Sequence, residues 1–465
     1  MDSKKIDLFE NDSIPKAVAK LSIPTVLSTL VMVLYNLADT YFVGMLADPI
    51  ESAAVTLAAP VLLAFNAINN LFGIGASSMM SRFLGKKDYD TVKKCAVFSF
   101  YSALVCAVFI SVFYTLFQAG IMSVLGVDAP TYAATGNYLM WTVSLGAAPA
   151  ILNVVMANMI RSEGSALHSS IGVMSGCLLN VILDPFFVLP RFLGMGAAGA
   201  GLATLISNSV ACLYFLVLIF LQRGRTYVCL DPRQFVVRMD IVKEVFGVGV
   251  PASVQNLLNV TGTIILNNFT AGYGEAAVAA MGIANKIIMV PMYLCMGITQ
   301  GIMPLVSYNY ARGNKKRMRD ASMFVLRTAM VLALTITLLY YVFSGEIVRM
   351  FMDNEEIVAY GRILLRCMCF VIPSMVIDFL AVGVFQAIGK GIYSLIFAIM
   401  RKVLLEIPAI ILLNLIWPFY GMGCAATVSE FVLAIAAIFM LMRIFRDDSK
   451  QKQDKKIAIL HRRKR

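Results

Sequence analysis

The chain has 465 residues, of which 59% are hydrophobic and only 14% are charged, and its mean hydropathy is +0.79. Because soluble globular proteins contain roughly 25% charged residues, this composition excludes a water-soluble domain and indicates a membrane protein. The formal net charge is +12, but residues 443–465 contain ten Lys/Arg and three Asp and so contribute +7 of it. We expect this segment to mark the cytoplasmic side and to contact anionic membrane lipids, with no nucleic-acid partner.

Apolar runs separated by short charged breaks predict twelve membrane-spanning helices. A helix needs about 20 apolar residues to cross the hydrocarbon core, and each run provides enough. The polar N-terminal segment lacks the order of a secretory signal peptide. In chain order the predicted spans are 15–46, 52–81, 94–118, 131–157, 166–189, 196–221, 241–271, 276–308, 321–343, 357–385, 392–416 and 421–443.

Successive loops alternate between basic and acidic residues. The loops after the second and eighth spans contain Lys86-Lys87 and Lys315-Lys316, whereas the opposite loops carry mainly acids such as Asp128. Basic residues gather in the cytoplasmic loops of membrane proteins. We therefore expect a multi-pass protein of the cell (inner or plasma) membrane with both termini in the cytoplasm.

Short motifs recur at a nearly constant offset, which indicates a duplicated half. Gly-Ile at 73–74 recurs at 301–302, and Gly-Met-Gly at 194–196 recurs at 421–423, offsets of 228 and 227 residues. Each half has an even number of spans, so both insert with the same orientation around a pseudo-twofold axis along the membrane normal. The predicted fold is an all-α integral membrane protein of two six-helix lobes. Its expected segments are a cytoplasmic N-terminal segment (1–14), a first lobe (15–221), a cytoplasmic linker (222–240), a second lobe (241–443) and a basic cytoplasmic tail (444–465).

Two carboxylates lie inside predicted spans of the first lobe. A charged residue within a membrane is costly and marks a functional site by default. Asp39 follows Tyr35 and Asn36 by four and three residues, so the three share one helix face. Asp184 follows Asn180 by four residues in the fifth span.

Further oxygen atoms are expected near these carboxylates. Pro185 has no N–H, so the carbonyl of Val181 lacks its helical partner, and Thr204 lies in the sixth span. Such a set of hard oxygen ligands suits a small cation or shared protons. We predict that H⁺ or Na⁺ binds here, with Na⁺ held by Asp39, Asn180, Asp184 and Thr204. The alternative is that these side chains form interhelical hydrogen bonds that only hold the bundle together.

The second half has no equivalent pair in its first and fifth spans. Its intramembrane charges are scattered, and the sequence does not pair them: Lys286, Asp378, Arg401, Lys402, Glu406 and Glu430. Amides, methionines and one tyrosine are the candidates for a substrate cavity: Gln255, Asn256, Asn259, Met289, Met292, Tyr293 and Met296. Flexible sulfur atoms and flat rings suit a promiscuous cavity for aromatic cations, and the alternative is ordinary helix packing.

Taken together, these motifs resemble the multidrug and toxic compound extrusion (MATE) family, closest to its MepA-like bacterial branch. The resemblance covers nearly the whole chain and depends on an ordered set of short motifs. They are Pro24, Tyr35-Asn36 with Asp39, Arg161 to Gly164, Asn180 with Asp184-Pro185, Gly194 to Ala198, Gln300 to Tyr310, and Gln386 with Gly389.

The resemblance implies a V-shaped antiporter that exports lipophilic, often cationic organic compounds in exchange for H⁺ or Na⁺ by alternating access. It implies a role in multidrug efflux and antibiotic resistance, and it places the cation site of the first lobe on Asp39, Asn180, Asp184 and Thr204. The NorM-like branch uses a carboxylate in the seventh span, where this chain has amides, so the resemblance does not extend to an ion site in the second lobe. We expect a monomer without a cofactor.

Two other functions are weighed. A flippase for lipid-linked oligosaccharides shares the superfamily, but such proteins often have fourteen spans and a more basic cavity. An intramembrane enzyme is disfavoured because the chain has only two histidines and contains no HExxH, GxSxG or Walker pattern. We therefore predict a transporter and no catalytic residues.

Overall fold

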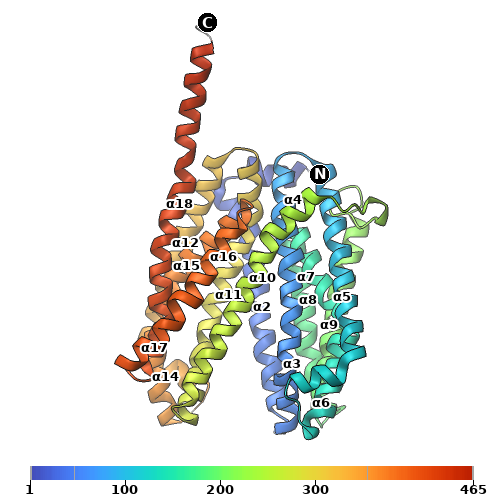
Figure 1. Ribbon diagram of the computed structural model, residues 1–465, viewed down its shortest axis with the longest axis vertical. Helices are drawn as coiled ribbons and strands as arrows, with labels where there is room; N and C mark the ends of the chain where they lie inside the picture. Colours follow the sequence, from blue (N-terminus) through green and yellow to red (C-terminus); the bar gives the residue numbers. More distant parts are fainter. Residues whose placement is uncertain (1–2, 47, 353, 463–465) are drawn as a thin grey trace.

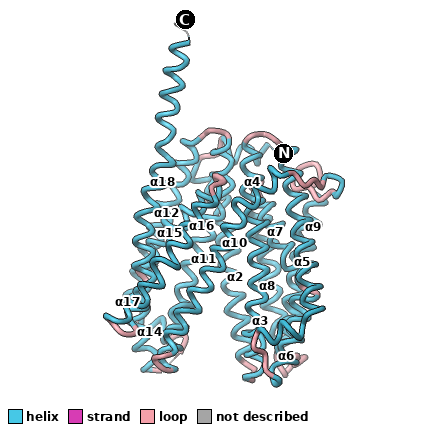
Figure 2. The backbone as a smooth tube through the Cα atoms, in the orientation of Figure 1, coloured by secondary structure: helices cyan, strands magenta, loops and turns pink. Residues whose placement is uncertain are grey.

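A computed structural model describes residues 3–46, 48–352 and 354–462, with side chains described for all of these except 3–4, 40 and 446–462. The charges expected in the tail at 444–465 lie outside the described side chains. In the described part of the chain, every regular element is a helix (Figures 1 and 2).

The first half contains α1 (Ser3–Glu10), α2 (Ile14–Gly44), α3 (Pro49–Ile68), η1 (Asn69–Ile74), α4 (Gly75–Gly85), α5 (Tyr89–Val124), α6 (Ala129–Leu139), η2 (Met140–Ser144), α7 (Ala147–Ser162), α8 (Ala166–Val188) and α9 (Gly196–Leu221). A short 3₁₀ turn, η3 (Pro232–Gln234), lies between the halves. The second half contains α10 (Met239–Ala271), α11 (Glu275–Ala311), α12 (Lys315–Val342), α13 (Ser344–Arg349), α14 (Glu355–Met368), α15 (Val371–Ala387), α16 (Gly391–Ile399), η4 (Met400–Glu406), α17 (Ile407–Ile416) and α18 (Tyr420–Arg462).

These helices account for the predicted spans. In the described residues, eight helical segments are long and apolar enough to cross a membrane, and α6–η2 with α7 and α14 with α15 pass the same test as bent pairs. The other two predicted spans correspond to α10 and to the continuous run α16–η4–α17. Amides in α10 and three charged residues in η4 place polar groups inside these two spans.

The helices form a V-shaped molecule (Figure 1). The two arms meet at the end that holds both chain termini and separate toward the opposite end, a shape that the backbone trace repeats (Figure 2). Where the arms meet, α2 packs against α11, and α10 packs against η1 and α4. The two arms are therefore closest at the end with the termini and farthest apart at the opposite end (Figures 1 and 2).

Small residues let these helices approach closely. A Cβ atom added at Gly249 of α10 would lie 2.0 Å from the backbone oxygen of Leu71 in η1. Small residues at helix interfaces are typical of membrane bundles, where packing replaces the hydrophobic effect. An ion pair between Arg82 of α4 and Glu244 of α10, at 2.6 Å, also joins the two halves there.

The two halves bend at corresponding places. The bent pairs α6–η2/α7 and α14/α15 each turn by 45°. Pro149 and Pro373 lie just after these bends, at offsets close to that of the repeated motifs. Proline removes a helical hydrogen bond and is a common cause of sharp kinks, so the kinks belong to the duplicated unit.

The N-terminal helix α1 lies across the closed end and contacts both halves. Phe9 is fully buried and stacks on Tyr308 of α11, with ring centroids 4.8 Å apart, and Glu10 accepts a hydrogen bond from the Tyr308 hydroxyl at 2.5 Å. Lys5 forms an ion pair of 3.1 Å with Glu163, directly after α7. These contacts tie the N-terminus to the place where the arms meet.

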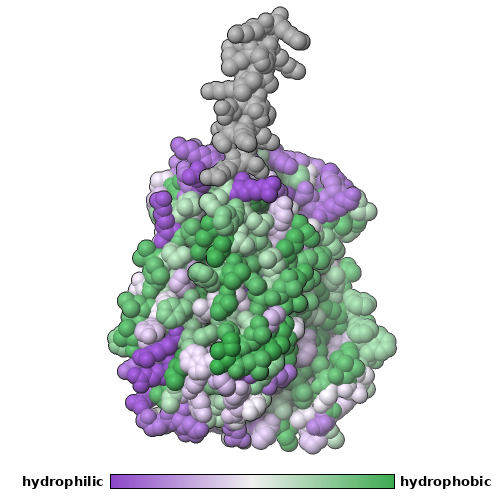
Figure 3. All heavy atoms as spheres, turned by 60° about the vertical axis from the view of Figure 1, so that its left-hand side comes forward, coloured by the Kyte–Doolittle hydropathy of each residue, from purple (hydrophilic) through white to green (hydrophobic). Residues whose placement is uncertain are grey.

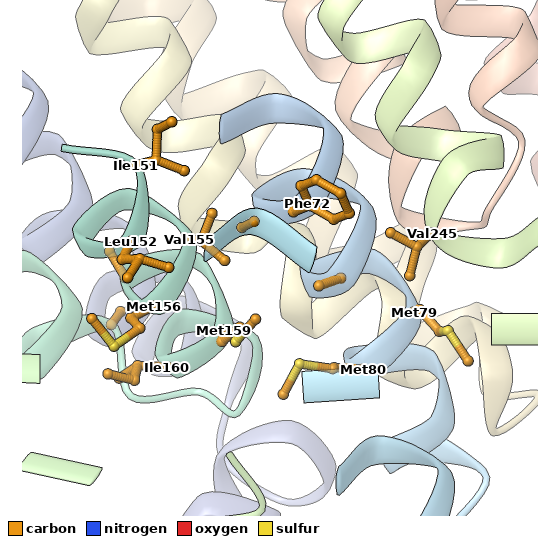
Figure 4. Close-up of a cluster of buried hydrophobic side chains, with 14 of the residues drawn as sticks. Phe72, Met79, Met80, Ile151, Leu152, Val155, Met156, Met159, Ile160 and Val245 are labelled. Carbon is orange, nitrogen blue, oxygen red and sulfur yellow. The ribbon is translucent and has the colours of Figure 1, made fainter. Parts of the chain in front are cut away.

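Apolar side chains cover the middle of the surface, and hydrophilic ones gather toward the two ends (Figure 3). Many large apolar side chains, such as Leu116, Leu415 and Phe439, are exposed, which suits a lipid environment. Inside the first arm, buried methionines and aliphatic side chains of α4 and α7 pack together with Val245 of α10 nearby (Figure 4). This core holds α7 firmly against η1 and α4.

Candidate ion and substrate sites

The carboxylate of Asp184 lies in the interior of the first arm. Asp184 in α8 is fully buried, and its Oδ1 atom has no hydrogen-bond partner. With the Asn180 amide in its favourable orientation, the amide nitrogen donates to Asp184 Oδ2 at 2.8 Å and the amide oxygen accepts from the backbone N–H of Thr204 at 3.2 Å. The tight packing of α8 against α9 brings these three residues together.

Asp39 approaches this group from α2, which packs against α8. Its side chain is half-buried, and it lies close enough to Asp184 for the two carboxylates to interact electrostatically. Tyr35 interacts electrostatically with both carboxylates. Asn36 is exposed, and its amide donates to the carbonyl of Met32 at 2.8 Å within the same helix.

Tyr138, which sequence reasoning missed, lies within electrostatic range of both acids. Its side chain is buried and interacts electrostatically with Asp39 and Asp184. It belongs to α6, a helix in which the sequence offers no charge or motif to draw attention. Only the packing of α6 against α9 and α3 shows that a phenol borders the site.

The acid pair lacks a cationic partner. In the described part of the chain, no Lys or Arg forms an ion pair with Asp39 or Asp184, and no group of three or more His, Cys, Asp or Glu side chains gathers to hold a metal ion. Two carboxylates in apolar surroundings repel each other and favour a bound proton or small cation. The Asn180 amide donates to Asp184, and the Thr204 hydroxyl lies beside that amide, so the neutral groups around the acids are polar but carry no positive charge.

A cavity lies between the arms near the closed end. Its volume is about 130 Å³, and it is lined by residues of both halves: Asn70, Ile74, Ser77, Asn158, Arg161, Ala252, Gln255, Asn256, Asn259, Met296, Thr299, Gln300, Met303, Phe379, Val382, Gly383 and Gln386. Four of the predicted substrate residues, Gln255, Asn256, Asn259 and Met296, belong to this lining.

Three other predicted substrate residues are not among the lining residues. Met292 and Tyr293 lie about one turn before Met296 on α11, and Met289 lies about two turns before it. Met292 is half-buried and packs against the core of the second arm. Arg161, Asn158 and the side chains from α15 line the cavity without having been selected from the sequence.

The scattered charges of the second half come together in one buried cluster. The guanidinium of Arg401 in η4 donates to Asp378 Oδ2 at 2.9 Å, to Glu430 Oε1 at 3.3 Å and to Asn259 Oδ1 at 2.6 Å. Lys402 pairs with Glu406 at 2.7 Å. Lys286, by contrast, is exposed.

The cluster contains its own cations. Arg401, Asp378 and Glu430 are 3%, 1% and 4% exposed, so the guanidinium offsets one of the two carboxylate charges within the protein. With all five groups ionised, two cations face three carboxylates. The sequence shows each charge, but the pairing depends on the meeting of α15, η4 and α18.

The V-shaped helical bundle, the buried acid pair and the cavity between two arms define a polytopic membrane transporter. A family model described as MatE matches residues 24–186 and again residues 251–412. The chain therefore belongs to the MATE family of transporters. The two matches begin 227 residues apart, which confirms the duplication inferred from the repeated motifs.

Known proteins of this family resemble the chain over nearly its whole length. It is 30% identical over 447 residues to the multidrug export protein MepA of Staphylococcus aureus strain MRSA252, covering 96% of this chain and 97% of that protein. It is also 30% identical over 448 residues to MepA of Staphylococcus saprophyticus, with the same coverage of 96% and 97%. A structure described as the outward-facing conformation of a multidrug resistance MATE family transporter superposes with a TM-score of 0.90 at 26% identity, covering 96% of this chain and 99% of that one.

These similarities confirm the predicted family and the predicted all-α fold of twelve spans in two lobes.

Proposed function

We propose that the protein is a secondary active exporter of lipophilic, often cationic organic compounds, driven by inward movement of H⁺ or Na⁺. Its relatives from Staphylococcus are named multidrug export proteins, which supports this cargo. The observation that carries the coupling step is the carboxylate pair of the half-buried Asp39 and the fully buried Asp184, with which no Lys or Arg forms an ion pair among the described residues. A bound proton or Na⁺ supplies the missing positive charge.

The proposed cycle is alternating access between two arms. The arms are separated at the end opposite the termini (Figure 1), and the related transporter structure is described as outward-facing. Opening the other end requires breaking the contacts there, including the Arg82–Glu244 ion pair and the 2.5 Å hydrogen bond from Ser78 to the carbonyl of Gln386. Ion binding beside α2 and α8 changes how these helices pack and shifts the balance between the two states.

The domain arrangement follows the duplication. The first lobe comprises residues 15–221 and the second 241–443, with 222–240 as a cytoplasmic linker; residues 1–14 and the tail at 444–465 are cytoplasmic as well. The basic loops and tail support this orientation. The transporter acts as a monomer in the cell membrane, in contact with its lipids.

Cysteine labelling tests the orientation. In a background without the nine native cysteines, an impermeant thiol reagent added outside intact cells should label Asp128→Cys but not Lys315→Cys. The reverse pattern would refute the proposed orientation.

Transport by purified protein tests the function. In proteoliposomes, an imposed proton or Na⁺ gradient should drive a fluorescent lipophilic cation against its own gradient, and collapsing the ion gradient should stop the transport. Equal movement of the dye with and without either gradient would overturn ion-coupled export.

A further inference from the structure

One residue of the cavity between the arms carries a full charge that the exporter function does not explain. Arg161, near the end of α7, is 7% exposed and lines the cavity. Its Nη1 atom donates to Asn158 Oδ1 at 3.2 Å and to Gln300 Oε1 at 3.1 Å, both neutral oxygen atoms. Its Nε–H is buried and has no hydrogen-bond partner.

Among the described residues, no carboxylate forms an ion pair with Arg161, and no other lining residue of the cavity is charged. The nearest acid in the sequence, Glu163, binds other groups. It forms an ion pair with Lys5 at 3.1 Å and accepts hydrogen bonds from the backbone N–H groups of Tyr227 and Val228 at 2.5 and 2.9 Å.

A buried guanidinium without a counter-charge is unfavourable. Arginine stays protonated in proteins, and an uncompensated buried charge costs several kcal/mol. A contact that only joined α7 to Gln300 of α11 would need a neutral donor and no charge. The cost is explained if an anionic group of a substrate completes the site.

We propose that Arg161 is the residue that recognises the carboxylate of aromatic substrates that carry one. This inference rests on the proposed function and names the side chain that sets the preference for such substrates. A guanidinium matches a carboxylate with two parallel hydrogen bonds. Amides such as Gln255 and Asn256 supply further donors, and Met303 and Phe379 supply apolar contact for a ring.

The size of the cavity sets how much of a substrate it holds. Its volume of about 130 Å³ is small beside the roughly 300–1,000 Å³ of typical drug pockets. The carboxylate-bearing end of a substrate would therefore enter the cavity, while the remainder lies outside it.

Two rhodamine dyes test the proposal, because they differ only at the carboxylate. Rhodamine 110 carries a free carboxylate beside its cationic ring system, and rhodamine 123 is its methyl ester. Equilibrium binding to purified, full-length protein is measured by fluorescence anisotropy for both dyes. Because a charge-assisted hydrogen bond contributes about 1.5–3 kcal/mol, we expect the acid to bind at least about tenfold more tightly than the ester.

Variants assign this preference to Arg161. Arg161→Gln should remove it by weakening the acid about tenfold while leaving the ester nearly unchanged, and Arg161→Lys should keep part of it. Arg191 is exposed in a loop, so Arg191→Gln makes the same change in net charge as a matched control and should keep the preference.

Three results would overturn the inference: wild-type protein that prefers the ester, an acid affinity unchanged in Arg161→Gln, or equal losses for both dyes, which would indicate a structural role. If Arg161→Gln does not fold, the comparison of acid with ester on wild-type protein, together with Arg161→Lys, tests the preference for the carboxylate. The protein could still bind and transport the ester in an ion-driven way without preferring the acid. That result would refute this inference and leave the proposed exporter function intact. Failure of both dyes to bind or move would count against the exporter function itself.

Discussion

The two arms come from one duplicated unit, yet their intramembrane acids differ in whether a cationic side chain pairs with them. In the first arm, Asp39 and Asp184 lie close enough to interact electrostatically, with an amide, a hydroxyl and a phenol nearby and no ion-paired Lys or Arg among the described residues. In the second arm, Asp378 and Glu430 both bond to the guanidinium of Arg401. The first arm therefore needs a cation from outside, whereas the second contains its own.

This difference shows why duplication need not give two coupling sites. At the offset of 227 residues, Asp39 corresponds to Leu266 and Asp184 to Ile411, so neither carboxylate has a counterpart. The acids of the second arm occupy other positions and are fixed by η4, a π-helical segment that carries Arg401. An ion that binds only one arm would move that arm relative to the other.

The largest expected effect is on ion-driven export by Asp184→Asn. The substitution removes the charge of a fully buried carboxylate and keeps the shape of the side chain. We expect export under a proton or Na⁺ gradient to fall by at least about tenfold, measured as dye transport in proteoliposomes. Asp39→Asn should behave similarly.

Folding controls accompany that measurement. Both variants should keep wild-type expression and thermal stability, because they remove a charge that has no cationic partner. Gradient-driven export at the wild-type rate by either variant would show that its carboxylate does not carry the coupling ion.

A second effect concerns stability in the other arm. Arg401→Met leaves Asp378 and Glu430 buried without a guanidinium, and breaking a buried ion pair in this way costs about 3–5 kcal/mol. Thermal unfolding in detergent should show a large loss of stability. Adding Asp378→Asn and Glu430→Gln to the same protein should restore much of it, because no unpaired charge then remains.

An Arg401→Met protein as stable as wild type would mean that the cluster is not held together by charge. The first and second arms would then not differ in the way their acids are neutralised.

The smallest effect is expected for Asp378→Asn alone. The cluster has three carboxylates and two cations, and the amide that replaces the carboxylate would still offer an oxygen to Arg401. We expect a stability change of no more than about 1 kcal/mol and export within about twofold of wild type. Loss of ion-driven export in this variant, with stability intact, would place a coupling site in the second arm as well.

The spans and the two intramembrane carboxylates could be predicted from the sequence for the same physical reason. Lipid excludes charge and unpaired backbone groups, so long apolar runs and rare intramembrane carboxylates such as Asp39 and Asp184 are visible one residue at a time. The duplication was visible as well, because turn and packing glycines recur at fixed positions.

Contacts between helices that are distant in the sequence could not be predicted from it. Arg401 meets its carboxylates only because α15, η4 and α18 converge, and Tyr138 reaches the acid pair through the packing of α6. Composition suggested a cavity along α11, but helix curvature and packing decide which turn faces it, so Met296 lines the cavity and Met289 does not.

The most direct test of coupling through the first arm is equilibrium binding of a fluorescent lipophilic cation to purified protein across pH and Na⁺ concentration. If ion and drug compete for the outward-open protein, each must weaken the other by the same factor. Wild-type protein should then bind the dye more weakly as protons or Na⁺ rise, and Asp184→Asn should bind it equally at every condition. Dye affinity that stays flat in the wild-type protein, or an ion dependence that survives in Asp184→Asn, would contradict coupling through this carboxylate.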